Sequence, residues 1–276
     1  MPYTSGEMSH QHSSSKRRDT SICTSRQLVT IVFRLFHRPS HEISVNAAER
    51  FYQRSHEVHR QVSEHIGSLT ASRALSRAGH RYYCVYEHLS RTPNACVVDL
   101  GFGTTHLLSD LASLCRSYTI VDVIDRTDGV ALPSNTYFKQ ADLNQDFPFE
   151  SQTFDCTVAM MIVEHLFDPF HAFHEITRIT KRGGKIFINL PNIAAIKCRL
   201  QLAVGKLPIT SSHDWFNKRE WDGNHLHYFT VKEVIRLAQL QGLTFDALFP
   251  VGKWPWLKQI SPGLLCHEIS YGFSRH

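Results

Sequence analysis

The chain of 276 residues lacks most features that mark secreted or membrane proteins. It has no run of about 18 apolar residues, so we expect no membrane span. Its N-terminal segment lacks the apolar core of a secretory signal. Its 7 cysteines form no Cys-x-x-Cys pair, and several fall in predicted strands, so we interpret them as reduced thiols. These absences together predict a cytoplasmic protein.

A strong charge of one sign is also absent. The chain has 30 Lys and Arg against 25 Asp and Glu, which leaves a net charge of +5. Part of this excess lies in the N-terminal segment, where a solvated basic stretch is the simplest interpretation. Charge alone therefore does not favour a nucleic-acid partner. A hydrophobic content of 42% at this length can bury one sizeable core.

Composition divides the chain into three parts. Residues 1–25 are rich in Ser, His and Gln and are predicted to form a disordered tail. Residues 26–91 are predicted to form an N-terminal helical segment. It begins with an apolar run that we interpret as a docking helix, with a membrane anchor or an organellar presequence as the alternatives. Residues 92–276 alternate strand and helix patterns and form the main domain. Within it, residues 193–224 break the alternation of strands and helices, and we interpret them as a lid over the site where a substrate would bind.

A glycine turn follows the first predicted strand of that domain. The β-branched run ends at Asp99, and Gly101-Phe102-Gly103 follows. Glycines at such a turn remove the Cβ atoms that would keep a ligand away from the backbone. The third glycine of the dinucleotide pattern would fall on His106, however. This favours a nucleoside ligand without a pyrophosphate.

Acidic residues end three successive apolar runs. They are Asp99, Asp122 and Asp142. The carboxyl ends of parallel strands meet at one edge of a sheet, where open α/β sheets bind ligands. Asp122 follows the glycine turn by about 20 residues, which is the spacing of a ribose-binding carboxylate. For each acid alone, a helix cap or turn is the alternative, but three in register favour a ligand site.

Turn and cap residues predict the remaining elements. Asp168-Pro169 is typical of a helix start, and Gly183-Gly184 is interpreted as the end of that helix. Phe170 and Phe173 are expected to face the sheet. The other elements expected are a strand at 185–190, a helical pattern at 193–204, a helix at 231–240 opened by a Thr230–Glu233 capping box, and strands at 243–249 and 267–273.

Candidate catalytic residues occur in two segments. Glu164 and His165 follow the fourth predicted strand, and His225 follows the predicted lid. Histidine has a pKa suited to removing a proton from the hydroxyl group of a substrate. The alternative is that His165 packs against the next helix and that His227 covers the core. The pairing of His165 with His225 favours a functional role.

These motifs resemble the class I S-adenosylmethionine-dependent methyltransferases from about Arg81 to the C-terminus. The segments that carry the resemblance are VVDLGFG, ADLNQDFPFESQTFDCTVAMMIVEH, KRGG, KIFINLPN and NHLHYFT. The resemblance implies an α/β fold with a Rossmann-like, mostly parallel seven-stranded sheet, its last strand antiparallel and helices on both faces. It also implies S-adenosyl-L-methionine as cofactor. Thr105 stands where the family usually has a third glycine.

The same resemblance implies roles for single residues. Gly101 and Gly103 would line the methionine and ribose, Asp122 would hold the ribose hydroxyls, and Asp142 with the Leu143 backbone would read the adenine. The cofactor-binding residues predicted in this way are Asp99, Gly101, Phe102, Gly103, Asp122, Val123, Asp142, Leu143 and Met160. The predicted catalytic residues are His165, Glu164 and His225.

A narrower resemblance concerns metal-dependent enzymes. Small-RNA terminal 2′-O-methyltransferases and ubiquinone-pathway O-methyltransferases carry E-x-x-E-H, and in the former two glutamates and two histidines hold a divalent ion. Here Met161 stands at the first glutamate, and a thioether binds hard cations poorly. We therefore predict no metal site; the alternative is that Glu164, His165 and His225 bind a softer ion.

Three segments most resemble those of small-molecule and glycan methyltransferases. They are the E-H-x-x-D-P pattern, the PN after the fifth strand and H-L-H-Y-F-T. We therefore predict an O-methyltransferase that acts on a small-molecule or glycan-like acceptor. The alternatives are an RNA ribose 2′-O-methyltransferase and a non-catalytic cofactor-binding subunit. A nicotinamide oxidoreductase is disfavoured by the missing third glycine and by the predicted antiparallel last strand.

Overall fold

The computed structural model describes residues 75–102, 107–125, 127, 131–211 and 221–276. The predicted disordered tail, most of the predicted N-terminal helical segment, Gly103, Thr105 and part of the predicted lid lie outside the described residues. In the part of the chain that is described, no helix is long and apolar enough to cross a bilayer.

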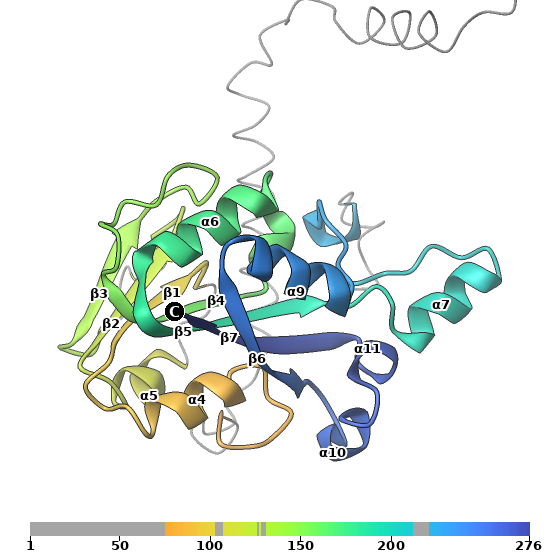
Figure 1. The fold of residues 1–276 in the computed structure, drawn as a ribbon, viewed down its shortest axis with the longest axis horizontal. Helices are drawn as coiled ribbons and strands as arrows, with labels where there is room; N and C mark the ends of the chain where they lie inside the picture. The colour runs from red at the N-terminus through yellow and green to blue at the C-terminus, as the bar shows by residue number, and fades with distance from the viewer. Residues whose placement is uncertain (1–74, 103–106, 126, 128–130, 212–220) are drawn as a thin grey trace, which may run out of the picture. The chain divides into compact units, whose positions relative to one another are not determined.

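A seven-stranded sheet forms the centre of the fold, in the order β3-β2-β1-β4-β5-β7-β6 (Figure 1). The first five strands are parallel, and β7 is antiparallel to both β5 and β6. This topology confirms the Rossmann-like sheet expected from the sequence. The strands are β1 Cys96–Leu100, β2 Ser117–Asp122, β3 Thr136–Gln140, β4 Phe154–Met160, β5 Thr180–Pro191, β6 Leu243–Pro250 and β7 Glu268–Arg275.

Helices cover both faces of the sheet. On one face, α6 and α9 pack in a hydrophobic cluster that includes Phe173 and Val234. On the other face, α4 and α5 contribute Leu89 and Leu111 to a second cluster. Central strands covered on both faces need nearly continuous apolar runs, as in β4. The helices are α4 Tyr83–Leu89, α5 Leu108–Ala112, α6 Pro169–Ile179, α7 Ile196–Ala203, α9 Val231–Leu240, α10 Pro255–Lys258 and α11 Pro262–Leu265, with the 3₁₀ turns η1 Val163–His165 and η2 Asp222–Asn224.

The start of α6 follows the prediction, because the Asp168 carboxylate accepts hydrogen bonds from the Phe170 and His171 backbone N–H groups at 2.8 and 3.2 Å. Two expectations for this region were wrong. Phe173 is fully buried, whereas Phe170 is 56% exposed, because the first turn of α6 extends toward the loop at 144–146 rather than over the sheet.

The second wrong expectation concerns Gly183-Gly184, which lies inside β5 and not at the end of a helix. The helix ends earlier, at Ile179, and β5 begins at Thr180. A Cβ on Gly184 would lie 2.8 Å from the Lys181 carbonyl oxygen and 3.0 Å from that of Asp155. The glycine is therefore required by the close packing of β5 against β4, where the register shifts.

The carboxyl ends of the parallel strands meet at one edge of the sheet. Leu100 lies opposite both Val121 and Ala159, and Asp122 lies opposite Gln140. Met160 at the end of β4 lies opposite Asn189 near the end of β5. The loops that follow these positions therefore lie together, and they carry the predicted site residues.

Candidate functional site

The glycine turn after β1 is shaped by close packing. Gly101 has φ of +70°, and a Cβ there would lie 2.5 Å from Ile162 Cγ1. The backbone N–H groups of Gly101 and Phe102 donate to the Val121 carbonyl oxygen at 2.8 and 3.2 Å. The Phe102 side chain is buried, with its ring centroid 6.4 Å from that of Tyr118. Only glycine fits at 101, because the left-handed backbone and the Ile162 side chain both exclude a larger residue.

Asp99 lies beneath this turn and is fully buried. The Tyr118 and Tyr82 hydroxyls donate to its Oδ2 at 2.7 and 3.1 Å. Burial raises the pKa of Asp99 to about 7, although both tyrosine hydrogen bonds act to lower it. The role of Asp99 in cofactor binding stays a prediction. Its two tyrosine partners are contacts that the sequence did not indicate.

This burial predicts how stability depends on pH. A carboxyl whose pKa is raised by folding stabilises the protein fully below its ordinary value of 3.8, and this stability is lost as the pH rises through about 7. As the pH rises, we therefore expect the free energy of unfolding of wild type to fall relative to that of Asp99→Asn. The fall is at most about 1.4 kcal/mol for each unit by which folding raises the pKa of Asp99.

Urea unfolding of the cofactor-free protein at about pH 5 and about pH 8.5 measures this difference. Asn can accept both tyrosine hydrogen bonds but cannot lose a proton, so the comparison isolates the ionisation of Asp99. A difference between the two proteins that stays constant with pH would contradict the expectation.

Asp122 and Asp142 lie close together at the ends of β2 and β3. The Ala141 N–H donates to the Asp122 carbonyl oxygen at 3.0 Å, and the Ile124 N–H donates to the Asp122 carboxylate at 3.3 Å. The Asp142 carboxylate accepts from the Asn144 backbone and side chain at 2.9 and 3.0 Å. Asp142 therefore has the role of a turn residue in this structure. The predicted roles of Asp122 at the ribose and of Asp142 at the adenine stay predictions.

The other predicted cofactor residues flank these positions. Val123 is half-buried, and its carbonyl oxygen accepts from the Gln140 side chain at 2.9 Å. Leu143 and Met160 are buried. Beyond Met160, the backbone of Met161 adopts a positive φ of 55°. This turn leads the chain from β4 directly into η1, which carries the predicted catalytic residues.

Glu164, His165 and His225 form one cluster, although 60 residues of sequence separate the two histidines. One potential ligand atom from each side chain lies within 4.8 Å of the others, and the two imidazole rings are 4.8 Å apart at 72°. The Leu226 and His227 N–H groups donate to the Glu164 carbonyl oxygen at 2.8 and 3.2 Å. These backbone bonds hold the second segment against η1 and bring the three residues together.

A buried hydrogen-bond network orients His225. The Asp222 carboxylate accepts from the Thr210 N–H, the Thr210 hydroxyl, and the N–H and hydroxyl of Ser211. Because Thr210 donates its one hydroxyl hydrogen to Asp222 at 2.7 Å, its oxygen accepts from His225 Nδ1 at 2.7 Å. This arrangement puts the hydrogen on Nδ1 and the lone pair on Nε2. Burial acts to raise the pKa of Asp222, but the hydrogen bonds from Thr210 and Ser211 outweigh it and hold the pKa below its ordinary value.

His165 is oriented in the same way. The Asn224 carbonyl oxygen lies 3.2 Å from His165 Nδ1, so Nδ1 is the donor and Nε2 carries the lone pair. Asn224 belongs to η2, where residues 222–224 all have positive φ. A Cβ on Gly223 would lie 2.6 Å from Ser211 Cβ. Thr210, Asp222 and Asn224 are thus supporting residues that the sequence analysis missed, and the only local signal for them was the turn-forming Asp-Gly-Asn.

Glu164 is fully buried, and neither carboxylate oxygen has a hydrogen-bond partner on another described residue. Burial raises its pKa to about 8, and the nearby Arg81 guanidinium acts to lower it. A neutral carboxyl at this position can donate a hydrogen bond to an acceptor oxygen. Two histidines and a glutamate are also ligand types for divalent transition metals. The absence of a metal, expected from Met161, stays a prediction.

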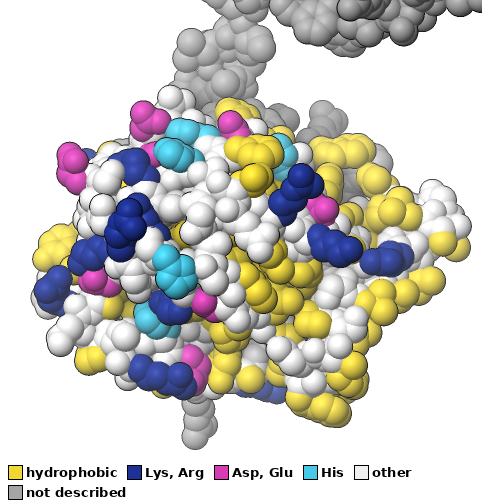
Figure 2. All heavy atoms as spheres, in the orientation of Figure 1, with side chains coloured by type: hydrophobic (Ala, Val, Ile, Leu, Met, Phe, Trp, Pro, Cys, Tyr) yellow, Lys and Arg dark blue, Asp and Glu magenta, His cyan; other side chains and the backbone are white. Residues whose placement is uncertain are grey.

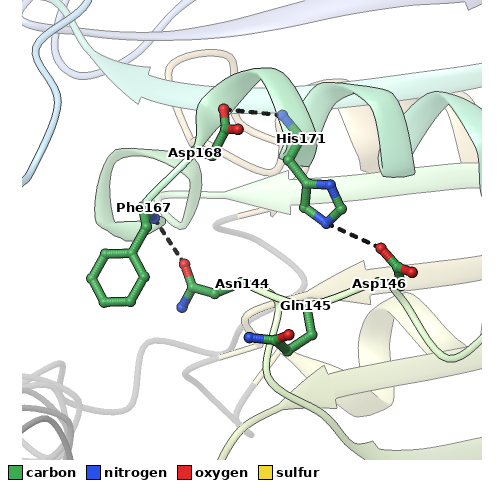
Figure 3. A pocket seen from close by; sticks show the side chains of 6 residues that line it. All are labelled: Asn144, Gln145, Asp146, Phe167, Asp168 and His171. Atoms are coloured by element: carbon green, nitrogen blue, oxygen red, sulfur yellow. Dashed lines mark hydrogen bonds and ion pairs between the residues drawn. The ribbon is translucent and has the colours of Figure 1, made fainter. Parts of the chain in front are cut away.

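A polar pocket of about 490 Å³ lies beside this edge, between the loop after β3 and the start of α6 (Figure 3). Asn144 Oδ1 accepts from the Phe167 N–H at 2.8 Å, and His171 Nε2 lies 3.7 Å from Asp146 Oδ1. His227 Nε2 lies 3.2 Å from the Phe167 carbonyl oxygen. The pocket therefore adjoins both the predicted adenine-reading loop and the histidine segment. No motif in the sequence indicates this pocket, because its walls come from two separate loops.

Comparison with known proteins identifies the type of domain. Residues 98–188 match a family described as a methyltransferase domain. An S-adenosylmethionine-dependent methyltransferase from Mesorhizobium loti is 12% identical with a TM-score of 0.53, covering 71% of this chain and 97% of that chain. A second such enzyme, from Aquifex aeolicus, is 12% identical with a TM-score of 0.51. The match covers 79% of this chain and 97% of that chain. No curated protein matches the chain in sequence.

A third similar structure is a complex. It joins the Haloferax volcanii Trm112 methyltransferase activator with a methyltransferase, at 16% identity and a TM-score of 0.50, covering 74% of this chain and 94% of that chain. At these identities the structural likeness shows the fold, and the family match at residues 98–188 is to a methyltransferase domain.

Proposed function

We propose that the chain is a class I S-adenosylmethionine-dependent methyltransferase, since residues 98–188 match a methyltransferase domain and the fold is that of such enzymes. Its acceptor in this proposal is a hydroxyl oxygen of a small-molecule or glycan-like compound. S-adenosylmethionine, when bound, supplies an activated methyl group on a sulfonium sulfur. In the transfer the carbon–sulfur bond breaks, a carbon–oxygen bond forms, and the acceptor proton passes to a base on the protein. The observation that carries the proposal is the cluster of Glu164, His165 and His225, which begins two residues after the Ile162 side chain that packs on Gly101.

The residues at the carboxyl edge of the sheet fit this cofactor. The turn at Gly101 follows the end of β1, and Asp122 lies at the end of the neighbouring strand β2. A carboxylate at that position can accept two hydrogen bonds from a ribose diol. The fully buried Asp99 supports the turn from beneath through its tyrosine contacts.

The cluster suits the removal of a proton from a hydroxyl. His165 Nε2 and His225 Nε2 carry lone pairs, since Nδ1 of each ring bonds to the protein. We assign His165 as the general base because it follows β4 directly, with His225 closing over the acceptor from the opposite segment. A protonated Glu164 orients the acceptor oxygen through a hydrogen bond. Positioning of this kind supplies much of the rate of an in-line displacement.

Transfer of a labelled methyl group to panels of small hydroxyl compounds, glycans and RNA with a terminal ribose diol tests the acceptor class. We expect base-stable methyl ethers on compounds of the first two panels. Labelling of RNA alone would establish the ribose 2′-O-methyltransferase alternative. Binding of S-adenosylmethionine with no transfer to any panel would favour a non-catalytic subunit. Each assay is run with and without EDTA, and activity that requires a restored divalent ion would overturn the absence of a metal.

Replacing Asp122 by alanine tests the cofactor assignment. We expect S-adenosylmethionine to bind at least about tenfold more weakly, because each charge-assisted hydrogen bond lost is worth roughly 1.5–3 kcal/mol. Calorimetric titration measures the affinity directly. Asp125→Asn, at an exposed acid three residues further on, is the matched control and should bind as wild type does. Equal affinities for all three proteins would refute the ribose role of Asp122.

The cellular location also stays a proposal. The cysteines among the described residues are all free thiols, and those at 84, 115, 156, 198 and 266 are buried. Free buried thiols are typical of reducing compartments, and on this ground we propose a cytoplasmic location.

A further inference from the structure

Large hydrophobic side chains are exposed on the side of the molecule that carries α7, α10 and α11 (Figures 1 and 2). Single exposed apolar residues are normal, but a large group of them marks an interaction site. We call the group the apolar–basic surface, because of the cations described below. Its apolar members are Ile196, Leu200, Leu202, Val204 and Leu207 around α7, and Trp254, Trp256, Leu257, Ile260 and Leu265 around α10 and α11.

The two segments that form this surface are joined by buried hydrogen bonds. Asn192, four residues before α7, donates through Nδ2 to the carbonyl oxygens of Gly263 and Cys266 at 2.9 and 2.8 Å. Its backbone N–H donates to the His267 carbonyl oxygen at 2.8 Å. These bonds hold the chain just before α7 against α11, so the two groups of exposed side chains lie on the same side of the molecule.

The charged side chains within these two segments are all cationic. Residues 193–207 and 251–267 contain no Asp or Glu. They carry four exposed cations, at Lys197, Arg199, Lys206 and Lys253, and a fifth, half-buried one at Lys258. Exposed apolar side chains interspersed with Lys and Arg are complementary to a layer that is apolar inside and anionic at its surface.

The most exposed members are also the residue types suited to a lipid interface. Trp254, Trp256 and Ile260 are 67%, 72% and 76% exposed, and Lys253 precedes the first of them. Tryptophan places its apolar ring among lipid chains and its N–H at the headgroups. Lysine extends its ammonium to the same level while its stem stays among apolar groups.

We infer that the apolar–basic surface docks on an anionic lipid bilayer, with α10 and α11 lying at the headgroup level. A second copy of the chain fits this face poorly, since self-association would bring the cations of both copies together. Docking of this kind lies on the membrane and needs no spanning helix. The inference does not depend on which acceptor is methylated. The surface lies near the candidate site, because α7 begins at Ile196, five residues after β5 ends at the carboxyl edge of the sheet.

The test is co-sedimentation of the full-length protein with vesicles of phosphatidylcholine and phosphatidylserine in equal parts. We expect binding at low salt that weakens as salt is raised, because the Debye length shortens. The double variant W256S/I260S should bind at least about tenfold more weakly, since two large apolar side chains no longer insert. Both positions are exposed, so melting temperatures should match wild type.

Tyr137→Ser is the matched control, because Tyr137 is exposed on β3 at the opposite edge of the sheet, and it should bind vesicles as wild type does. K206E/K253E should lower binding about fivefold or more on anionic vesicles. No binding of wild type at low salt, or equal binding by wild type and W256S/I260S, would overturn the inference. A dimer in light scattering that W256S/I260S abolishes, without vesicle binding, would assign the face to a second copy instead.

Discussion

Replacing His165 by alanine is expected to lower the turnover number by about 10²–10⁴-fold, the range usual for loss of a general base. His165 lies in the cluster with Glu164 and His225, and its Nδ1 bond to Asn224 points Nε2 away from the supporting turn. The affinity for S-adenosylmethionine should stay nearly unchanged, because the predicted cofactor contacts other than Met160 lie in or after β1, β2 and β3. Initial rates of methyl transfer together with calorimetric cofactor titration measure both quantities.

His174→Ala is the control for this substitution. His174 lies on α6, exposed, with its ring near the Gln241 side chain at 3.3 Å, and its loss should leave turnover unchanged. A general base also shapes the pH profile, so the alanine variant should lose the rise of rate that accompanies deprotonation of the imidazole. Turnover of H165A within a factor of about two of wild type would assign the base to another residue or leave positioning as the main source of rate.

Replacing Asp222 by alanine is expected to lower the free energy of unfolding by about 3 kcal/mol and to reduce turnover as well. Asp222 is buried and accepts hydrogen bonds from both the backbone and the side chains of Thr210 and Ser211. Its removal leaves several buried donors without a partner, and each costs about 1–3 kcal/mol. Turnover falls because Thr210 no longer holds the hydrogen of His225 on Nδ1.

Two further variants separate the structural role of Asp222 from its positioning role. Ser211→Ala removes the hydroxyl hydrogen bond to Asp222 but leaves the backbone N–H bond and the Thr210–His225 contact, so it should destabilise by about 1 kcal/mol with turnover preserved. Thr210→Val removes the hydroxyl that accepts from His225 and should shift the pH profile of turnover. Urea unfolding gives the free energies. If D222A were as stable as wild type, the network would have no structural role.

Local sequence signals predicted the elements well where neighbouring residues decide them. The cap at Asp168 depends on backbone N–H groups two and three residues away, and the apolar strands ending at Asp99 and Asp122 depend on burial on both faces. The end of α6 could not be predicted from Gly183-Gly184. Pairing of Thr180 with Phe154 extends β5 toward the helix and draws the glycines into the strand.

The sequence by itself determined the order of strands and helices, the glycine turn at Gly101 and the acids at the strand ends, because these follow from residue type and near spacing. Only the tertiary structure decided which distant residues meet. The tyrosines on Asp99, the pairing of His165 with His225 and the Asp222–Thr210 support all join segments that only the folded sheet brings together. Hydrogen bonds and desolvation act over a few ångströms, whatever the separation along the chain. The raised pKa values of Asp99 and Glu164 therefore arise with the fold.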